Sequence, residues 1–374
     1  MERADVVIIG GGVIGAAAAC HLALRGVTDV VLLERDTLAA GSTSRSAGGV
    51  RLQFADELNI RIMERSLPVF EQWDSVIGEH VGYVSPIALH QVGYLFLLDT
   101  PELVDTFRGA VELQRSLGVD TRWLTPAEAA ELAPGVVTDD LLAATWNPRE
   151  GHCSPESVTQ GFAAAAAAHG VRIRQGCAAT GIRVEGGRIA AVATEAGTIA
   201  TDTVICAAGA WSPEIGAMVG VAVPVRGEKR WMWFSPESGG LPESLPLTID
   251  FSTGFYCHRE GPGLVFGGRE PDLEGVAEHA LHRLPVIAEL PVARDWWGYY
   301  EVSPDHNAIL GEVADGPGRL LVATGFSGHG FQQAPAIGEH LAELVTGAVP
   351  TLDLAAFALS RFADGEEREE RFVV

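Results

Sequence analysis

Residues 5–36 read DVVIIGGGVIGAAAACHLALRGVTDVVLLERD, and the fold can be inferred from them. Residues 5–9 are a β-branched run that ends in glycine, which indicates a buried strand. Residues 16–24 are alanine-rich with apolar spacings of three and four, typical of a helix packed closely on a sheet, and Gly26 ends that helix. Residues 30–33 form a second apolar run. We therefore predict a βαβ unit at the start of the chain.

The glycines of this unit predict a dinucleotide site. They follow a strand and open a helix, and their spacing permits a tight turn, close approach of a pyrophosphate and close helix packing. The helix N-terminus offers free N–H groups and its positive dipole end to the phosphates. A carboxylate at Glu34 is expected to accept the ribose hydroxyls and to repel a 2′-phosphate. The predicted contacts here are Gly10, Gly12, Val13, Ile14, Gly15, Glu34 and Arg35.

The motif does not choose between NAD and FAD, but the residues after it do. GSTSRSAGGVRLQF, residues 41–54, is small and polar where an NAD dehydrogenase usually continues with further βαβ repeats. Its hydroxyl side chains, Ser42, Thr43 and Ser44, suit an extended diphosphate or ribityl chain. An antiparallel meander with turns at Gly186–Gly187 and 195–197 precedes the next buried strand, and it is a second sign of FAD.

Composition excludes several classes of function. The net charge of −23 argues against nucleic acid and against an anionic membrane surface. The five cysteines include no CxxC pair, so we expect neither disulfides nor a metal site, and most should be small buried side chains. With no secretory signal and no stretch long enough to span a bilayer, a reducing, cytoplasmic location is expected.

The order of elements predicts two discontinuous domains with a site between them. At 374 residues the chain is too long for one small core. The charged run DGEEREER, 364–371, is expected to be a solvated helix end or a frayed terminus without a task. Nucleotide-fold signals occupy 1–50, 150–215 and 305–374, and the remaining 51–149 and 216–304 contain helices and strands rich in aromatic residues.

Six segments in the same order carry a resemblance to the D-amino-acid oxidase superfamily of flavoproteins. Within it, the chain is most similar to the sarcosine oxidase and dimethylglycine dehydrogenase branch and to the beta subunit of L-proline dehydrogenase. The resemblance implies an α/β fold: a Rossmann-like FAD domain of the glutathione-reductase type with an interleaved antiparallel-sheet substrate domain. The segments are VVIIGGGVIG (6–15), LLERD (32–36), GSTSRSAGGVRLQF (41–54), VICAAGAWS (204–212), GYYEVSPDHNAILG (298–311) and ATGFSGHGF (323–331).

The resemblance implies that the late glycine loop meets the flavin ring. Backbone N–H groups around 326–330, backed by the dipole of the following helix, would face the pyrimidine carbonyl and N1 edge and favour the reduced, anionic flavin. His329 either lies over the cofactor or packs between domains. The other implied cofactor contacts are Arg45, Ala179, Ala208, Gly209, Trp211, Gly325, Phe326, Ser327, Gly328, Gly330, Phe331 and Gln332.

Departures from the family pattern refine this expectation. Relatives attach flavin through a histidine or a cysteine at the places that are here Arg45 and Gly298, so we predict non-covalent FAD. A lysine that assists reaction with oxygen in the monomeric oxidase is matched by Val265, which favours a dehydrogenase or a slow oxidase. Another lysine, which helps to hold the substrate carboxylate, is matched by Gln332, a neutral donor.

On the substrate side, the family's carboxylate-binding arginine corresponds to Arg51, with Arg226, Arg230 and Arg269 as rivals. Tyr256 and Tyr300 fall at places that line the family's pocket, although they are equally consistent with ordinary core aromatics. The catalytic candidates are therefore Arg51, Tyr256, Tyr300 and His329.

We predict FAD-dependent oxidation of a secondary or N-methylated amino acid, such as sarcosine, dimethylglycine or proline. A hydride would pass from the carbon next to nitrogen to flavin N5, and the imine would hydrolyse. The acceptor would be oxygen or a redox protein, and a homo- or hetero-oligomer is possible. The rivals are deamination of the D-amino-acid or glycine oxidase type, an NAD-dependent dehydrogenase, and a non-catalytic flavin-bound assembly factor.

Overall fold

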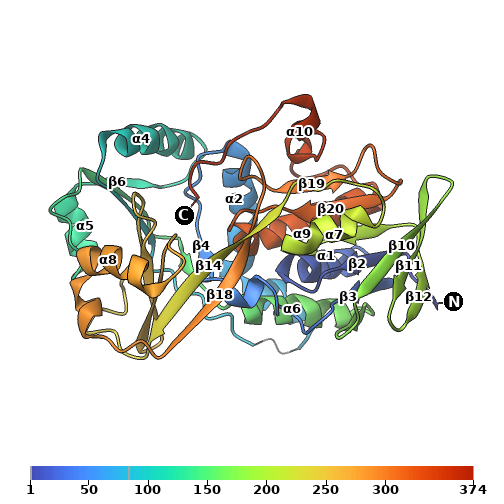
Figure 1. The fold of residues 1–374 in the computed structure, drawn as a ribbon, viewed down its shortest axis with the longest axis horizontal. Coiled ribbons are helices and arrows are strands. Elements are labelled where there is room, and N and C mark those ends of the chain that lie inside the picture. Colours follow the sequence, from blue (N-terminus) through green and yellow to red (C-terminus); the bar gives the residue numbers. More distant parts are fainter. Residues whose placement is uncertain (1, 83–84, 374) are drawn as a thin grey trace.

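The computed structural model describes residues 2–82 and 85–373. Figure 1 shows two parts that lie side by side: one contains the N-terminal βαβ unit, and the other contains α4 (Pro101–Ser116), α5 (Pro126–Leu132) and α8 (Leu273–Arg283) around a larger sheet. Each of the two main sheets belongs to one part. Within the described residues, no helix combines the length and apolar character that crossing a membrane requires.

A six-stranded sheet in the order β19-β20-β13-β2-β3-β9 forms the centre of the first part. All neighbouring strands run parallel except β19, which pairs antiparallel with β20 at the edge. This confirms the predicted Rossmann-like architecture. The strands are β2 (Val6–Ile9), β3 (Val30–Leu33), β9 (Arg172–Arg174), β13 (Val204–Cys206), β19 (Ile309–Glu312) and β20 (Leu320–Thr324).

Both faces of this sheet are buried, because successive side chains of β2 alternate between two cores. Val6 and Ile8 pack against helices, whereas Val7 and Ile9 pack against the meander. The meander forms a four-stranded sheet in the order β1-β12-β11-β10. Its strands are β1 (Glu2–Arg3), β10 (Ala179–Glu185), β11 (Arg188–Thr194) and β12 (Gly197–Ala200).

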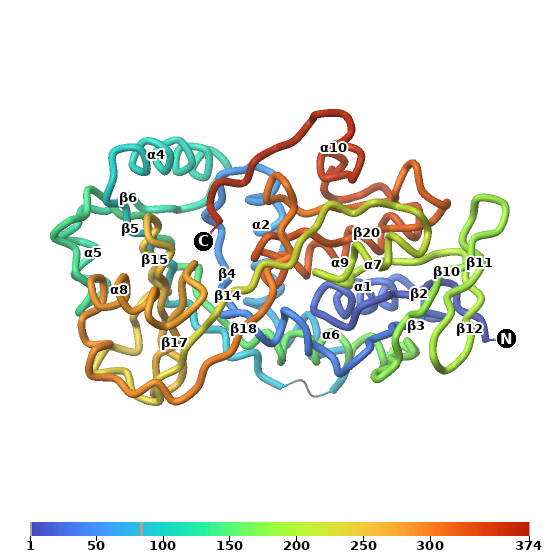
Figure 2. The backbone as a smooth tube through the Cα atoms, viewed as in Figure 1, coloured from blue at the N-terminus to red at the C-terminus, as the bar shows by residue number. Residues whose placement is uncertain are grey.

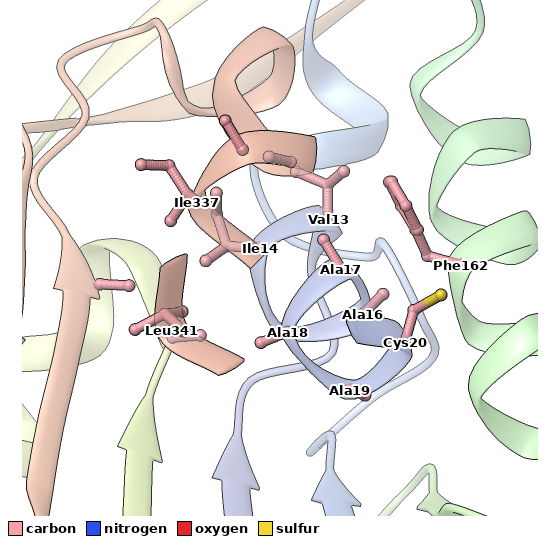
Figure 3. Packing of buried hydrophobic residues seen from close by; sticks show 14 of the residues in the cluster. Val13, Ile14, Ala16, Ala17, Ala18, Ala19, Cys20, Phe162, Ile337 and Leu341 are labelled. Carbon is pink, nitrogen blue, oxygen red and sulfur yellow. The ribbon is translucent and has the colours of Figure 1, made fainter. Parts of the chain in front are cut away.

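The helix layer depends on small residues. Helix α1 (Val13–Leu24) packs between α9 (Gly330–Thr346) and α6 (Pro155–Ala168), and Figure 3 shows Ile337 and Leu341 on one side of α1 and Phe162 on the other. A Cβ atom at Gly338 would lie 2.6 Å from the carbonyl carbon of Ala17. Backbone therefore approaches backbone at this crossing, which explains the alanine run.

The second part is built on an eight-stranded sheet in the order β18-β14-β17-β16-β15-β5-β7-β6, antiparallel except for the parallel pair β15 and β5. One face packs against α5 and α8, and the other packs around Phe107 of α4. The strands are β5 (Tyr94–Leu98), β6 (Arg122–Leu124), β7 (Ala143–Asn147), β14 (Arg226–Ser235), β15 (Leu247–Asp250), β16 (Tyr256–Glu260), β17 (Gly263–Gly267) and β18 (Arg294–Val302).

The remaining elements connect the two parts. A two-stranded pair, β4 and β8, lies in one connection, and α2 packs against α9. The five cysteines are buried and free, as expected for small core side chains. The remaining bounds are α2 (Glu57–Glu71), α3 (Trp73–Val76), α4 (Pro101–Ser116), α5 (Pro126–Leu132), α7 (Ser212–Ala217), α8 (Leu273–Arg283), α10 (Arg361–Asp364), β4 (Gly49–Val50) and β8 (Gly151–His152).

The division into two discontinuous domains remains our proposal. The strands of both sheets in the first part fall within 1–50, 150–215 and 305–374, and those of the eight-stranded sheet within 51–149 and 216–304.

The expectation that the charged tail is solvated and without a task is wrong. After α10 the chain runs back to the boundary between the two parts (Figure 2). Glu370 is fully buried and accepts hydrogen bonds from the backbone N–H groups of Ala55 and Asp56, at 3.1 and 3.0 Å, where α2 begins. Phe372 is also fully buried, and its ring stacks on Phe107 with centroids 4.0 Å apart. The free N–H groups of a helix N-terminus give this carboxylate the partners that burial requires.

Candidate active site

A cavity of about 410 Å³ lies where the parallel strands end and the second part begins. Its walls include residues directly after β2, β3 and β13 and residues of β14, β16 and β18. Of the predicted cofactor contacts, Gly15, Ser44 and Gly325 do not line it. Those that do are Gly10, Gly12, Val13, Ile14, Glu34, Arg35, Ser42, Thr43, Arg45, Ala179, Ala208, Gly209, Trp211, Phe326, Ser327, Gly328, His329, Gly330, Phe331 and Gln332.

The first glycine motif meets two distinct requirements. Gly10 has a φ of 117°, and a Cβ there would lie 2.2 Å from the carbonyl oxygen of Ala207. A Cβ at Gly15 would lie 1.9 Å from the carbonyl oxygen of Gly10, so Gly15 serves helix packing. Helix α1 begins at Val13 without a side-chain cap from Gly12. The N–H of Val13 donates to Oγ1 of Thr43 at 3.2 Å, so the N–H groups of Ile14 and Gly15 remain to donate to a phosphate.

Glu34 is held firmly at the end of β3. Its two carboxylate oxygens accept hydrogen bonds from the backbone N–H groups of Gly11 and Asp36, each at 2.8 Å. Each oxygen keeps a lone pair for a further donor, as the binding of two ribose hydroxyls needs. Beside it, the guanidinium of Arg35 lies 4.0 Å from the ring centre of Trp211, and both residues line the cavity.

The late glycine loop lies at the other end of the cavity, but its glycines are needed chiefly for packing. Gly325 and Gly328 have positive φ angles of 73° and 96°. A Cβ at Gly328 would lie 2.5 Å from the ring of Tyr300. The N–H groups of Ser327 and His329 are already bonded to protein carbonyls. Among the described residues, the donors left for a ligand are the N–H of Gly328 and those of the first turn of α9, which has no side-chain cap.

The two positions at which relatives attach flavin covalently are neighbours in space. A Cβ at Gly298 would lie 2.5 Å from Cβ of Arg45, and both residues line the cavity. Arg45 also donates from Nη1 to the carbonyl oxygen of Trp297 at 3.2 Å. Neither side chain is a nucleophile, and the absence of Cβ at Gly298 makes room for the arginine.

Of the four arginines considered for substrate binding, Arg51 and Arg230 line the cavity, whereas Arg226 and Arg269 do not. Arg51 is 4% exposed and lies over the ring of Phe54 at 3.9 Å. Its Nη1 donates to the carbonyl of Gln53. Its Nη2 donates to another carbonyl, on the C-terminal tail, at 2.6 Å.

Arg230 is more accessible than Arg51, with 21% of its side chain exposed. Its guanidinium lies 5.1 Å from the ring centre of Tyr300, and Nη2 contacts Glu228 at 3.2 Å. Its Nε atom is buried and has no hydrogen-bond partner among the described residues. Tyr256 and Tyr300 line the same cavity, and burial raises the pKa of both phenols, so both are neutral donors.

His329 both lines the cavity and packs between the two parts. Its ring lies edge-on to Phe54 with centroids 5.0 Å apart. Burial, followed by the nearby charge of Arg51, lowers the pKa of His329 well below its usual value, so the imidazole is neutral. Gln332 uses its Oε1 atom to accept a hydrogen bond from the backbone N–H of Arg51 at 2.7 Å.

The cavity residues that were not predicted from the sequence include Tyr94, Glu301 and Phe372. Burial raises the pKa of Glu301 to about 7, although Thr324 donates to its carboxylate at 2.9 Å. Glu301 lies within the family-like segment 298–311, which could have pointed to it. Tyr94 and Phe372 reach the cavity from segments that carry no motif, so only the tertiary structure reveals them.

A dinucleotide with an uncharged ring system at one end fits these walls. The N-terminus of α1 and the carboxylate of Glu34 lie at one end, and the N-terminus of α9 lies with aromatic residues at the other. The fold and the cavity thus define a flavin-binding class of oxidoreductase.

The chain belongs to the FAD dependent oxidoreductase (DAO) family, whose model matches residues 5–344. It is therefore an FAD-dependent oxidoreductase. It is 32% identical to the structure of L-proline dehydrogenase from P. horikoshii, which aligns with a TM-score of 0.90 over 98% of this chain and 100% of that one. Glycine oxidase from Geobacillus kaustophilus is 27% identical, with a TM-score of 0.85 over 96% and 99% of the two chains.

Curated relatives include mitochondrial dimethylglycine dehydrogenase from Rattus norvegicus, 30% identical over 96% of this chain. The chain spans only 45% of that protein's length. FAD-dependent oxidoreductase domain-containing protein 1 from Xenopus laevis is 32% identical over 100% of this chain and 85% of its own length.

Proposed function

We propose that this enzyme oxidises a secondary or N-methylated amino acid of the sarcosine, dimethylglycine or proline type. When bound, FAD supplies the acceptor for a hydride from the carbon next to nitrogen, and the imine product hydrolyses in water. The observation that carries the proposal is a single cavity whose lining combines the predicted cofactor contacts with Arg51, Arg230 and two half-buried tyrosines, Tyr256 and Tyr300. The names of the sarcosine, dimethylglycine and L-proline dehydrogenase relatives support the substrate class.

The arginines are suited to hold the carboxylate of such a substrate. A guanidinium forms strong, charge-assisted hydrogen bonds with a carboxylate. Arg230 is the better placed of the two, because 21% of its side chain is exposed at the cavity, whereas Arg51 is only 4% exposed and donates to two buried backbone carbonyls. We infer that Arg230 binds the carboxylate directly and that Arg51 adds positive potential.

The remaining side chains position the amine and exclude water. Tyr256 and Tyr300 supply neutral walls with hydroxyl groups, and neutral His329 adds no charge. A neutral amine needs no protein base, because its own lone pair drives loss of the hydride. The contribution of the chain is orientation and desolvation in a site that is largely shielded from solvent.

A dehydrogenase that passes electrons to an acceptor other than oxygen is favoured. The chain contains one lysine, Lys229, which is exposed and lies 4.3 Å from the ring centre of Trp297. No lysine therefore lines the cavity. Val265, the position matched by sequence to an oxygen-activating lysine, is buried in β17 away from the cavity wall.

An anaerobic screen of flavin reduction tests this function. The FAD-loaded protein is mixed with sarcosine, dimethylglycine, L- and D-proline, glycine and larger N-methyl amines, and bleaching near 450 nm is followed. Bleaching by a secondary or N-methylated amino acid, faster than by glycine or primary D-amino acids, is expected. Faster bleaching by primary amino acids would instead indicate deamination of the glycine or D-amino-acid oxidase type. The absence of bleaching with every candidate would indicate a non-catalytic flavoprotein.

A further inference from the structure

A cluster of histidines and one glutamate lies outside the cofactor cavity. His152 in β8 and His258 in β16 are buried, at 5% and 1% exposure, and Glu260 is exposed at the end of β16. One ligand atom from each of the three lies within 4.8 Å of the other two. The rings of His152 and His258 are 4.2 Å apart, and His90 stacks on the outer side of His152 with centroids 5.2 Å apart.

The strand geometry places two of these side chains together. Residues at i and i+2 of a strand share a face, so His258 and Glu260 project to the same side of β16. Residues Cys257, His258 and Arg259 of β16 pair with β17, so the backbone that carries His258 and Glu260 is held in the sheet. His152 is held opposite by its pairing with Gly49 across β4 and β8. The three groups therefore come from rigid elements of two different sheets.

His258 is oriented in the way that metal-bound histidines usually are. Its Nδ1 atom lies 2.8 Å from the carbonyl oxygen of Arg259, and since a carbonyl can only accept, Nδ1 carries the proton. Nε2 then presents its lone pair, and this buried atom has no well-formed hydrogen bond in residues 2–82 and 85–373, with the backbone of Ala47 close to the ring. Metal ligands commonly donate their other ring N–H to a carbonyl, which fixes both tautomer and ring orientation.

We propose that His152, His258 and Glu260 bind one divalent transition-metal ion of the zinc type. Two imidazoles and one carboxylate form a ligand set that suits zinc, with the fourth position open to water. Tetrahedral bonds of about 2.0–2.1 Å place ligand atoms about 3.4 Å apart, so the present atoms need to close by at most about 1.5 Å. Glu260 is exposed and free to make most of that movement.

The ion would act as a structural tie between the two-stranded pair and the eight-stranded sheet. Gly49 and Val50 of β4 pair with His152 and Gly151, and Arg51 follows directly. A metal bridge from β8 to β16 would therefore hold the segment that carries Arg51 against the strand that carries Tyr256. The site does not line the cofactor cavity, so its occupancy is expected to affect stability more than the chemical step.

Zinc binding to the purified, FAD-loaded full chain tests this proposal. After treatment with a chelator, zinc alone is titrated against a chromophoric competitor, and bound zinc is counted by atomic emission after gel filtration. One zinc ion per chain and a zinc-dependent rise in Tm are expected, because a ligand that binds only the folded state stabilises it. Fewer than about one ion per two chains would overturn the proposal.

Variants locate the ion. His258→Gln removes a buried ligand and is expected to weaken binding by at least ~100-fold, and the exposed Glu260→Gln is expected to weaken it by at least ~10-fold. His279→Gln is the matched control, because His279 is a histidine with Glu270 at 3.9 Å but belongs to no such cluster. It should bind zinc as the parent protein does. If His258→Gln fails to fold, Glu260→Gln decides, and unchanged affinity in that variant overturns the assignment.

Discussion

The carbonyl oxygen of Phe372 accepts a hydrogen bond from Nη2 of Arg51 at 2.6 Å. This contact joins the last described residues of the tail to the wall of the active-site cavity. Both Arg51 and Phe372 line that cavity. The tail is anchored a little earlier by Glu370, which bonds to the start of α2. The segment 370–372 thus stabilises the boundary between the two parts. It also accepts a hydrogen bond from Arg51, the arginine that the family resemblance matched to the substrate carboxylate.

Glu370→Gln should destabilise the protein. The carboxylate accepts from the backbone N–H groups of Ala55 and Asp56 and from the side chain of Asn59, at 3.0–3.1 Å. A glutamine amide would turn an NH₂ group toward some of these donors, which costs about 1–3 kcal/mol for a buried group left without a partner. The free energy of unfolding in urea measures the effect. Glu369→Gln, at an exposed neighbour, is the control, and equal losses in both variants would contradict the role of Glu370.

Arg230→Met should raise KM for carboxylated substrates by about 10- to 100-fold, the loss expected for one or two charge-assisted hydrogen bonds. Arg51→Met should raise KM less and lower Tm more, because it removes hydrogen bonds to Gln53 and Phe372 within the protein. Steady-state kinetics and thermal unfolding of both variants separate these effects. The exposed Arg226→Met is the control, and a larger KM effect at Arg51 would return the carboxylate to that residue.

Gly10→Ala should abolish tight flavin binding. The new Cβ would lie 2.2 Å from the carbonyl oxygen of Ala207, in addition to the strain of a φ of 117°. Gly26→Ala is a matched control, because Gly26 also has a positive φ, 86°, but no atom lies within 4 Å of its added Cβ. In Gly26→Ala, backbone strain alone should lower the free energy of unfolding by about 1 kcal/mol. The ratio of absorbance at 450 nm to 280 nm after gel filtration measures bound flavin, and equal retention in both variants would argue against a steric role.

Acid precipitation should release all of the flavin into the supernatant. Neither Arg45 nor Gly298 offers a nucleophile at the positions where relatives are linked to the cofactor. Absorbance of the supernatant and of the washed pellet measures the distribution. Yellow colour that stays with the pellet would show a covalent bond and contradict the prediction.

The free energy of unfolding should fall as the solution is acidified below about pH 6.5. His21 in α1 has an Nε2 atom that is buried and has no partner in the described part of the chain, and burial lowers its pKa to about 4. The unfolded chain takes up this proton near pH 6.5, whereas the folded chain does so only near pH 4. Its stabilising contribution is therefore complete above about pH 6.5 and is lost between these values as pH falls.

His21→Gln tests this dependence. Glutamine does not titrate, so the slope of unfolding free energy against pH should decrease by up to one proton, about 1.4 kcal/mol per pH unit near pH 5. Urea unfolding of both proteins at about pH 5, 6 and 7 measures the slopes. Parallel curves for parent and variant would show that His21 does not contribute.

The sequence predicted the Rossmann-like core well because its signals are local. A buried strand, a glycine turn and an alanine-rich helix within residues 5–36 specify a βαβ unit whose parts are neighbours in the chain. Glu34 and residues 326–332, which the sequence assigned to the two ends of the cofactor, line one cavity, and their contact with FAD stays a prediction. Gly15 has the packing role expected of the first motif, whereas the ring of Tyr300, rather than a cofactor, lies where a Cβ at Gly328 would be.

What the sequence alone determined is thus the class of fold, the cofactor and the residue types that surround it, because short-range patterns encode them. The tertiary structure was needed to show which arginines line the cavity, that Glu370 and Phe372 are buried, and that His152, His258 and Glu260 come together. Those relationships join residues that are far apart in the chain. Packing between sheets brings such residues together, and no local periodicity in the sequence indicates which of them will be in contact.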